Sequence, residues 1–96
     1  MELTFEAVLW EHSGEGSWHF VTLPEELADD VREHAAPGPG FGSVRVTARV
    51  GDVTWQTSLF PEARARSYVL PVKKQVRAAN DLVAGDLVSV RIDLAG

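Results

Sequence analysis

The segment from residue 43 to residue 60 constrains the fold most, because alternating apolar and polar residues flank a tight-turn signal, Gly51-Asp52. Folding the chain back at this turn places apolar residues on one face and polar residues on the other. A slip of one residue would destroy both rows, so the sequence predicts a β-hairpin with a defined register. The inward pairs, all but one of them fully apolar, are Val50 with Val53, Ala48 with Trp55, Val46 with Thr57 and Val44 with Leu59. The outward pairs are Arg49 with Thr54, Thr47 with Gln56 and Arg45 with Ser58.

Four further segments have the alternation and composition of β-strands. Residues 2–10 alternate between two faces, and residues 17–21 follow a turn signal at residues 13–16 and close a second hairpin. Residues 67–70 form a short strand, and residues 88–94 alternate after a tight turn. Each of these strands brings an apolar row to a common core.

Two short helices are predicted between the strands. The first begins near Pro24, where Thr22 and Glu25 are expected to form a capping box, and it ends at Pro37-Gly38-Pro39-Gly40. The second, of about two turns, is predicted over Val72–Ala79. The inward residues are Leu23, Leu27, Val31 and Ala35 of the first helix, and Val72, Val76 and Ala79 of the second.

The resulting order of elements, β-β-α-β-β-β-α-β, indicates a mainly β (α+β) protein. A sheet of about six strands that curls into a small closed barrel, capped by the two helices, would bury every apolar row and remove most exposed edges. The 96 residues leave room for one core, so we expect residues 1–96 to form a single domain.

Composition restricts the cellular setting. No apolar run approaches the ~18 residues of a membrane-spanning helix. The first residues, MELTFEAVLWEH, are acidic and alternating, unlike a signal peptide. The chain has no cysteine, which excludes disulfides, thiol catalysis and cysteine-based metal sites. We therefore expect a cytoplasmic protein that does not insert into membranes.

The residue types that carry catalysis lack the spacing that catalysis needs. His12, His19 and His34 show no metal-ligand spacing, and a bound metal usually has three or four protein ligands. No nucleophile elbow surrounds Thr57 or Ser58. We therefore predict no catalytic residue, no metal and no cofactor, and we expect that the protein is not an enzyme.

Basic residues gather in the second part of the chain. Residues 1–40 carry nine acidic residues and one basic residue, whereas residues 41–96 carry eight basic and five acidic residues. Tyr68, Lys73, Lys74 and Arg77 form the clearest cluster, at the start of the second predicted helix, where free N–H groups and the helix dipole also favour an anion. The cluster is interpreted either as solvated surface charge or as an anion-binding site.

The three tryptophans divide between core and surface by their place in the alternation. Trp55 belongs to the inward row of the hairpin, and Trp18 shares a face with Phe20, so both are predicted in the core. Trp10 lies on the face opposite Phe5. It is therefore the candidate aromatic residue of a pocket or an interface.

Four ungapped motifs along the chain are similar to those of a known family. They are Phe20-Val21-Thr22-Leu23-Pro24, Gly42-Ser43-Val44-Arg45-Val46, Trp55-Gln56-Thr57-Ser58-Leu59-Phe60-Pro61 and Tyr68-Val69-Leu70-Pro71-Val72-Lys73-Lys74. From Phe5 to Leu94 the chain resembles the domain-of-unknown-function family numbered 1905. The resemblance implies a small bacterial or archaeal β-barrel of the double-split type, and members sometimes carry a second domain associated with bacteriocin protection. It implies no biochemical activity and no catalytic residue.

A second resemblance covers the last third of the chain. Leu70-Pro71, the basic helix, Leu82-Val83-Ala84-Gly85-Asp86 and the strand after it are similar to the swapped-hairpin barrels of AbrB-type transcription factors. That resemblance implies a nucleic-acid-binding dimer, although this chain is acidic overall, with a formal net charge of −5. We expect a binding or interaction module whose partner is a small anionic ligand or a protein. An AbrB-like nucleic-acid-binding homodimer is the alternative.

Overall fold

The computed structural model describes residues 1–14, 17–34 and 42–94. In these ranges seven strands and two helices follow one another in the order β-β-β-α-β-β-β-α-β. Their bounds are Glu2–Val8 (β1), Trp10–Glu11 (β2), His19–Thr22 (β3), Glu25–His34 (α1), Val44–Val50 (β4), Val53–Glu62 (β5), Ser67–Pro71 (β6), Lys74–Ala79 (α2) and Leu87–Leu94 (β7). Part of the turn predicted at residues 13–16, the inward position of Ala35 and the loop at residues 37–40 lie outside the described residues.

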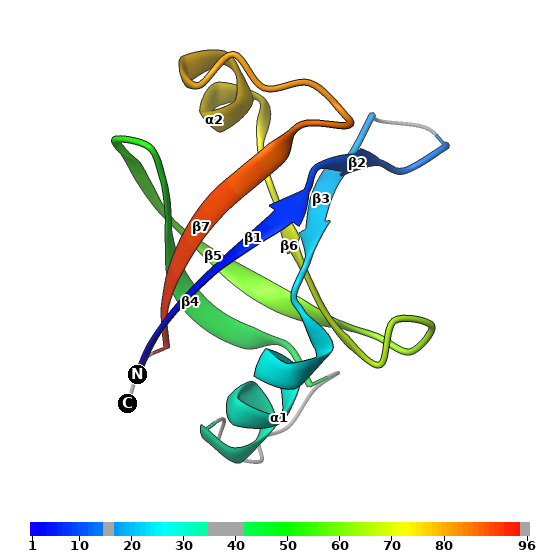
Figure 1. Ribbon diagram of the computed structural model, residues 1–96, viewed down its shortest axis with the longest axis vertical. Coiled ribbons are helices and arrows are strands. Elements are labelled where there is room, and N and C mark those ends of the chain that lie inside the picture. The colour runs from blue at the N-terminus through cyan, green and yellow to red at the C-terminus, as the bar shows by residue number, and fades with distance from the viewer. Residues whose placement is uncertain (15–16, 35–41, 95–96) are drawn as a thin grey trace.

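The strands form one antiparallel sheet that is strongly curled into a half-barrel (Figure 1). The strand order is β1-β7-β4-β5-β6-β3-β2. The two helices lie at opposite ends of the curl, which confirms the mainly β fold with two capping helices. The core fills the inside of the curl, and its largest fully buried side chains are Leu9, Leu23, Leu59, Leu70, Ile92, Val21, Val31, Val72 and Val76.

The predicted first strand, residues 2–10, is divided at Leu9, which raises the number of strands from six to seven. β1 pairs with β7, whereas β2 pairs with β3. At the division, the Leu9 N–H donates to the carbonyl of Asp86 at 2.9 Å, and the Leu9 carbonyl accepts the N–H of Gly85 at 2.8 Å. The two ends of the strand order are therefore parts of one chain segment, and this segment brings the edges of the sheet together.

The hairpin of β4 and β5 has the predicted register at every position, from Val44 opposite Leu59 to Val50 opposite Val53. Trp55 exposes 8% of its surface and faces the core, as predicted. At the turn, Gly51 has a φ of +59°, a left-handed conformation that glycine adopts without steric cost. The turn signal and the alternation thus determine this element together.

Gly51→Ala is expected to lower the free energy of unfolding by about 1–2 kcal/mol. The left-handed backbone disfavours a side chain, and the added Cβ would overlap Oδ1 of Asn80. The Asn80 amide donates from Nδ2 to the carbonyls of Val50 and Val76, at 3.3 and 3.0 Å, so displacing it loosens the contact between the hairpin and α2. Urea denaturation measures the loss, with Gly14→Ala as the control, because its Cβ would meet His12 only at an ordinary 3.4 Å. A loss below about 0.5 kcal/mol would contradict the expectation.

The first helix, α1, begins at Glu25 and buries Ala28 and Val31 against the sheet. The predicted capping role of Thr22 is wrong, because Thr22 is the last residue of β3. Its hydroxyl oxygen instead accepts the indole N–H of Trp10 at 2.9 Å. The side chain that the sequence assigned to the helix thus joins β2 to β3.

The second helix, α2, is shorter than predicted, since it begins at Lys74 rather than Val72. Lys73 still has an extended backbone, with φ −70° and ψ 161°, and therefore precedes the helix. Val72 and Val76 are buried as predicted, but Ala79 is exposed and its predicted inward position is wrong. Neither described helix is long and apolar enough to cross a membrane.

Candidate functional site

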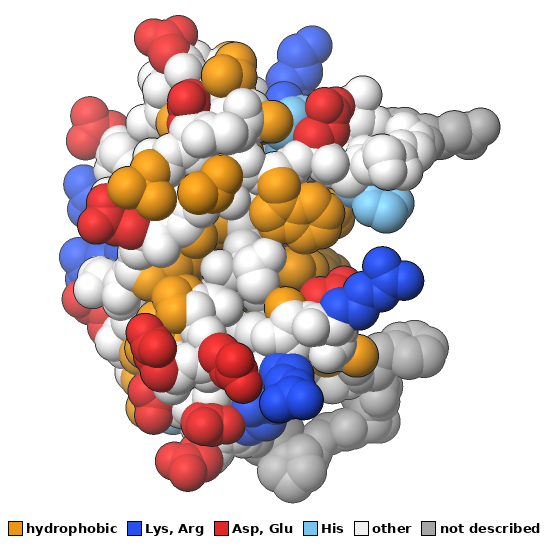
Figure 2. All heavy atoms as spheres, turned by 45° about the vertical axis from the view of Figure 1, so that its right-hand side comes forward, with side chains coloured by type: hydrophobic (Ala, Val, Ile, Leu, Met, Phe, Trp, Pro, Cys, Tyr) orange, Lys and Arg blue, Asp and Glu red, His pale blue; other side chains and the backbone are white. Residues whose placement is uncertain are grey.

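The outer face of β2, β3, β6 and β5 carries an apolar groove, here called the aromatic groove. Strand pairing places Trp10, Phe20 and Pro71 in one row on this face and Phe60 and Val69 in the next. Figure 2 shows hydrophobic side chains in this hollow, with charged and histidine side chains around it. The cavity has a volume of about 600 Å³ and is lined by Trp10, His12, Trp18, Phe20, Phe60, Pro61, Glu62, Val69 and Pro71.

The rings of the aromatic groove contact one another in two arrangements. The centroids of Trp10 and Phe20 are 5.1 Å apart with planes inclined by 34°, and those of Trp18 and Phe20 are 6.3 Å apart with nearly parallel planes. The hydrogen bond from the Trp10 indole to Thr22 fixes the orientation of the Trp10 ring. The structure places Trp10 among the residues that line this cavity.

Trp18 corrects the sequence prediction of a core residue, because 57% of its surface is exposed. The two faces of this segment are the reverse of those predicted from the alternation of its residues. Val21 faces the core with no exposed surface, so Phe20 and Trp18 face outward. Trp18 thus contributes a broad ring surface that is free to meet a ligand.

A second cavity adjoins the aromatic groove and is here called the basic pocket. It has a volume of about 250 Å³ and shares Trp18 and Pro71 with the groove. The hydrogen bond from the Val72 N–H to the His19 carbonyl, at 2.9 Å, holds its two sides together. The pocket is lined by Ser17, Trp18, His19, Pro71, Val72, Lys73, Lys74 and Arg77.

The three cations of the basic pocket, Lys73, Lys74 and Arg77, form no ion pair with any part of the chain that the structure describes. Arg77 donates from Nε to the carbonyl of Val72 at 3.1 Å, which holds its guanidinium beside the two lysines. Asp81 lines a separate cavity on another side of Lys74 and Arg77, without an ion pair to either. The pocket therefore presents positive charge that an anion would neutralise.

Tyr68 lies apart from the three cations with which the sequence grouped it. Its ring is buried, with 7% of its surface exposed, and the guanidinium carbon of Arg32 lies 5.8 Å from its centroid. Arg32 also donates to the carbonyl of Arg66 at 2.8 Å. Tyr68 therefore anchors α1 to the sheet and does not line the basic pocket.

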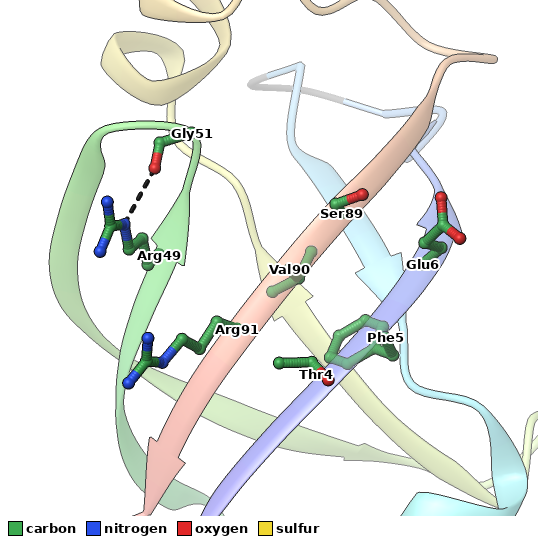
Figure 3. Close-up of a pocket in the computed structure, with 8 residues that line it drawn as sticks. All are labelled: Thr4, Phe5, Glu6, Arg49, Gly51, Ser89, Val90 and Arg91. Atoms are coloured by element: carbon green, nitrogen blue, oxygen red, sulfur yellow. Dashed lines mark hydrogen bonds between the residues drawn. The ribbon is translucent and has the colours of Figure 1, made fainter.

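A third surface hollow, drawn in Figure 3, lies over β1, β7 and β4 and contains two arginines. Arg49 and Arg91 are directly opposite in the ladder and extend to the same side of the sheet. Each already has partners: Arg91 pairs with Glu2, and Arg49 donates to the Gly51 carbonyl at 3.0 Å. Nη2 of Arg49 also lies 3.8 Å from Oδ1 of Asp52. Because these charges already have partners, the basic pocket is the better candidate for an anion site.

Several residues of the two cavities were not singled out by the sequence as site residues. His19, Phe60 and Glu62 enter only because β3 and β5 pair with the two edges of β6. The alternation in the sequence indicates which residues are on the outer face of a strand. It does not indicate which strands are neighbours, so it could not bring these residues together. Within residues 1–14, 17–34 and 42–94, no three His, Asp or Glu side chains form a group that could hold a metal ion.

Comparison with known proteins identifies a family but no activity. The family model described as a domain of unknown function, DUF1905, matches residues 5–92, nearly the whole chain. No curated protein gives a significant match.

Proposed function

The chain belongs to the DUF1905 family of domains of unknown function, and we propose that it is a non-catalytic module that binds a small ligand with a flat apolar group and an anionic group. The flat group lies in the aromatic groove and the anionic group lies in the basic pocket. The same proposal places the protein in the cytoplasm, where small anionic metabolites are available.

The observation that carries this proposal is that the two cavities adjoin each other. Trp18 and Pro71 line both of them, so one ligand can touch the rings and the cations at the same time. Stacking on an aromatic side chain contributes about 1–3 kcal/mol per ring, and hydrogen bonds to charged groups are stronger than neutral ones. Together the cavities have the size of a small-molecule site, which is typically about 300–1,000 Å³.

The side chains of the site support binding more than chemistry. The aromatic groove offers ring surface, and the basic pocket offers the flexible ammonium groups of Lys73 and Lys74 with the fixed guanidinium of Arg77. These groups hold and orient a ligand through stacking and charge. The proposal therefore assigns no bond-making step to the protein.

Lys73→Gln combined with Lys74→Gln is expected to weaken the binding of phenyl phosphate, a probe that joins one ring to one phosphate, by at least about tenfold. NMR titration measures the dissociation constant and shows which amides shift. In the unmodified protein, shifts are expected at residues 17–20 and 71–77, and affinity is expected to fall with added salt, because exposed charges are screened. Arg45→Gln is the matched control, because Arg45 is an exposed cation outside both cavities.

The two lysines offer an independent measurement, because they are the only lysines of the chain. Acylation by a lysine-selective reagent, followed by mass spectrometry, is expected to slow at both residues when phenyl phosphate is bound. Unchanged acylation, together with no shift at residues 17–20 or 71–77 at millimolar phenyl phosphate, would overturn the proposed function.

The AbrB-like nucleic-acid-binding dimer stays a prediction. The same NMR titration with a short DNA duplex tests it. Duplex binding with a steep salt dependence would favour this alternative over a small-molecule module.

A further inference from the structure

We infer that the ligand is a free nucleotide whose base carries an exocyclic amino group, with its phosphate in the basic pocket and its base in the aromatic groove beside Glu62. This inference rests on the proposed function and names the class of ligand. It follows from the distribution of charge along the two adjoining cavities.

The two adjoining cavities carry opposite charges at their far ends. Glu62 lines the aromatic groove and lies opposite Ser67, the first residue of β6. Lys73 lines the basic pocket just beyond Pro71, the last residue of β6. Because a strand rises about 3.3 Å per residue, Ser67 and Pro71 are about 13 Å apart. A complementary ligand is therefore elongated, anionic at one end and a hydrogen-bond donor at the other.

The cationic end suits a phosphate. Lys73, Lys74 and Arg77 provide three positive charges around one small cavity. A terminal phosphate carries nearly two negative charges at neutral pH and has three acceptor oxygens, so it can engage all three side chains. A single carboxylate, with one negative charge and two acceptor oxygens, would compensate less of this charge and engage fewer of these side chains.

The acidic end selects the base. An ionised carboxylate can only accept hydrogen bonds, and Oε1 of Glu62 already accepts the Arg64 N–H at 3.1 Å. The carboxylate keeps further acceptor capacity, so it can also accept a hydrogen bond from a ligand donor. Cytosine, adenine and guanine have an exocyclic amino group that can donate to it, whereas uracil has a carbonyl oxygen at the position of the cytosine amino group. Phe60 lies on the same face as Glu62, and the nearly parallel rings of Trp18 and Phe20 extend the aromatic surface towards the basic pocket, so the groove between the two ends offers stacking surface for the ring.

The test compares cytidine and uridine monophosphates, because they differ at that one position. The cytidine nucleotide is expected to bind at least about tenfold more tightly, since an oxygen facing Glu62 leaves two acceptors unpaired. Glu62→Gln is expected to reduce this preference to about threefold or less, because an amide can present either a donor or an acceptor. Glu11→Gln, an exposed carboxylate outside the cavity, is the matched control and should keep the preference.

The titrations with phenyl phosphate and with the two nucleotides test the proposed function and this inference separately. If phenyl phosphate binds at residues 71–77 but the two nucleotides bind equally, the inference is overturned while the proposed function stands. If phenyl phosphate also fails to bind, both are overturned. A short single-stranded oligocytidylate that binds tenfold more tightly than the mononucleotide would overturn the assignment to a free nucleotide, whereas equal or weaker binding supports it.

Discussion

Replacing Trp55 with alanine is expected to remove about 3–5 kcal/mol from the free energy of unfolding. The Trp55 side chain is buried, and it lies opposite Ala48 in the ladder between β4 and β5. Ala48 is small and is held on its other side by Ile92 of β7, so it cannot move to fill the vacated space. Because a small domain has a total stability of about 5–15 kcal/mol, the variant should be close to unfolding.

Urea denaturation followed by circular dichroism measures the effect of Trp55→Ala without relying on tryptophan fluorescence. Trp18→Ala is the matched control, because it removes the same side chain from an exposed position and should cost about 1 kcal/mol or less. A similar small loss for both variants would mean that Trp55 does not fill the core.

Leu9→Ala is expected to cost about 2–5 kcal/mol. Leu9 has no exposed surface, and it stands where the first strand segment changes partner from β7 to β3. Its backbone bonds the turn at Gly85 and Asp86, so the surrounding chain is held in place and cannot close the cavity. The loss of stability therefore includes both the transfer free energy of the removed side-chain atoms and the cost of the cavity that they leave.

Val8→Ala is the control for Leu9→Ala, because the neighbouring Val8 exposes 53% of its surface. It should change the free energy of unfolding by less than about 0.5 kcal/mol in the same urea titration. If Leu9→Ala were as mild as this control, the segment would not join the two edges of the sheet in the way described.

The elements that could be predicted from the sequence are those whose determinants are local. The β4–β5 register depends on alternation and on one turn, Gly51-Asp52, which lie together in the chain. The division at Leu9 could not be predicted, because the alternation continues through it and only the partner strand changes. Thr22 was misassigned because capping and strand residues look alike before the hydrogen bond from Trp10 is known.

The candidate site was predictable in its parts but not in its assembly. Lys73 and Lys74 are recognisable as a basic cluster, and Trp10 as an outward ring, from their neighbours alone. Their joining through Trp18 requires the pairing of β3 with β6, which connects residues about 50 positions apart and has no local signal. The same reason explains Tyr68, whose neighbour in space is Arg32 of α1 and not the nearby lysines.

Because β1 pairs with β7, the first strand of a newly synthesised chain cannot pair until the last strand has been made. The first strand leaves the ribosome long before its partner, because Glu2 pairs with Asp93. At a synthesis rate of about 5–20 residues per second, its apolar face stays without a partner for roughly 5–20 s. Glu2 and Glu6 lie on the exposed face of this strand. Like charges at these two positions disfavour the pairing of one such unpartnered strand with another.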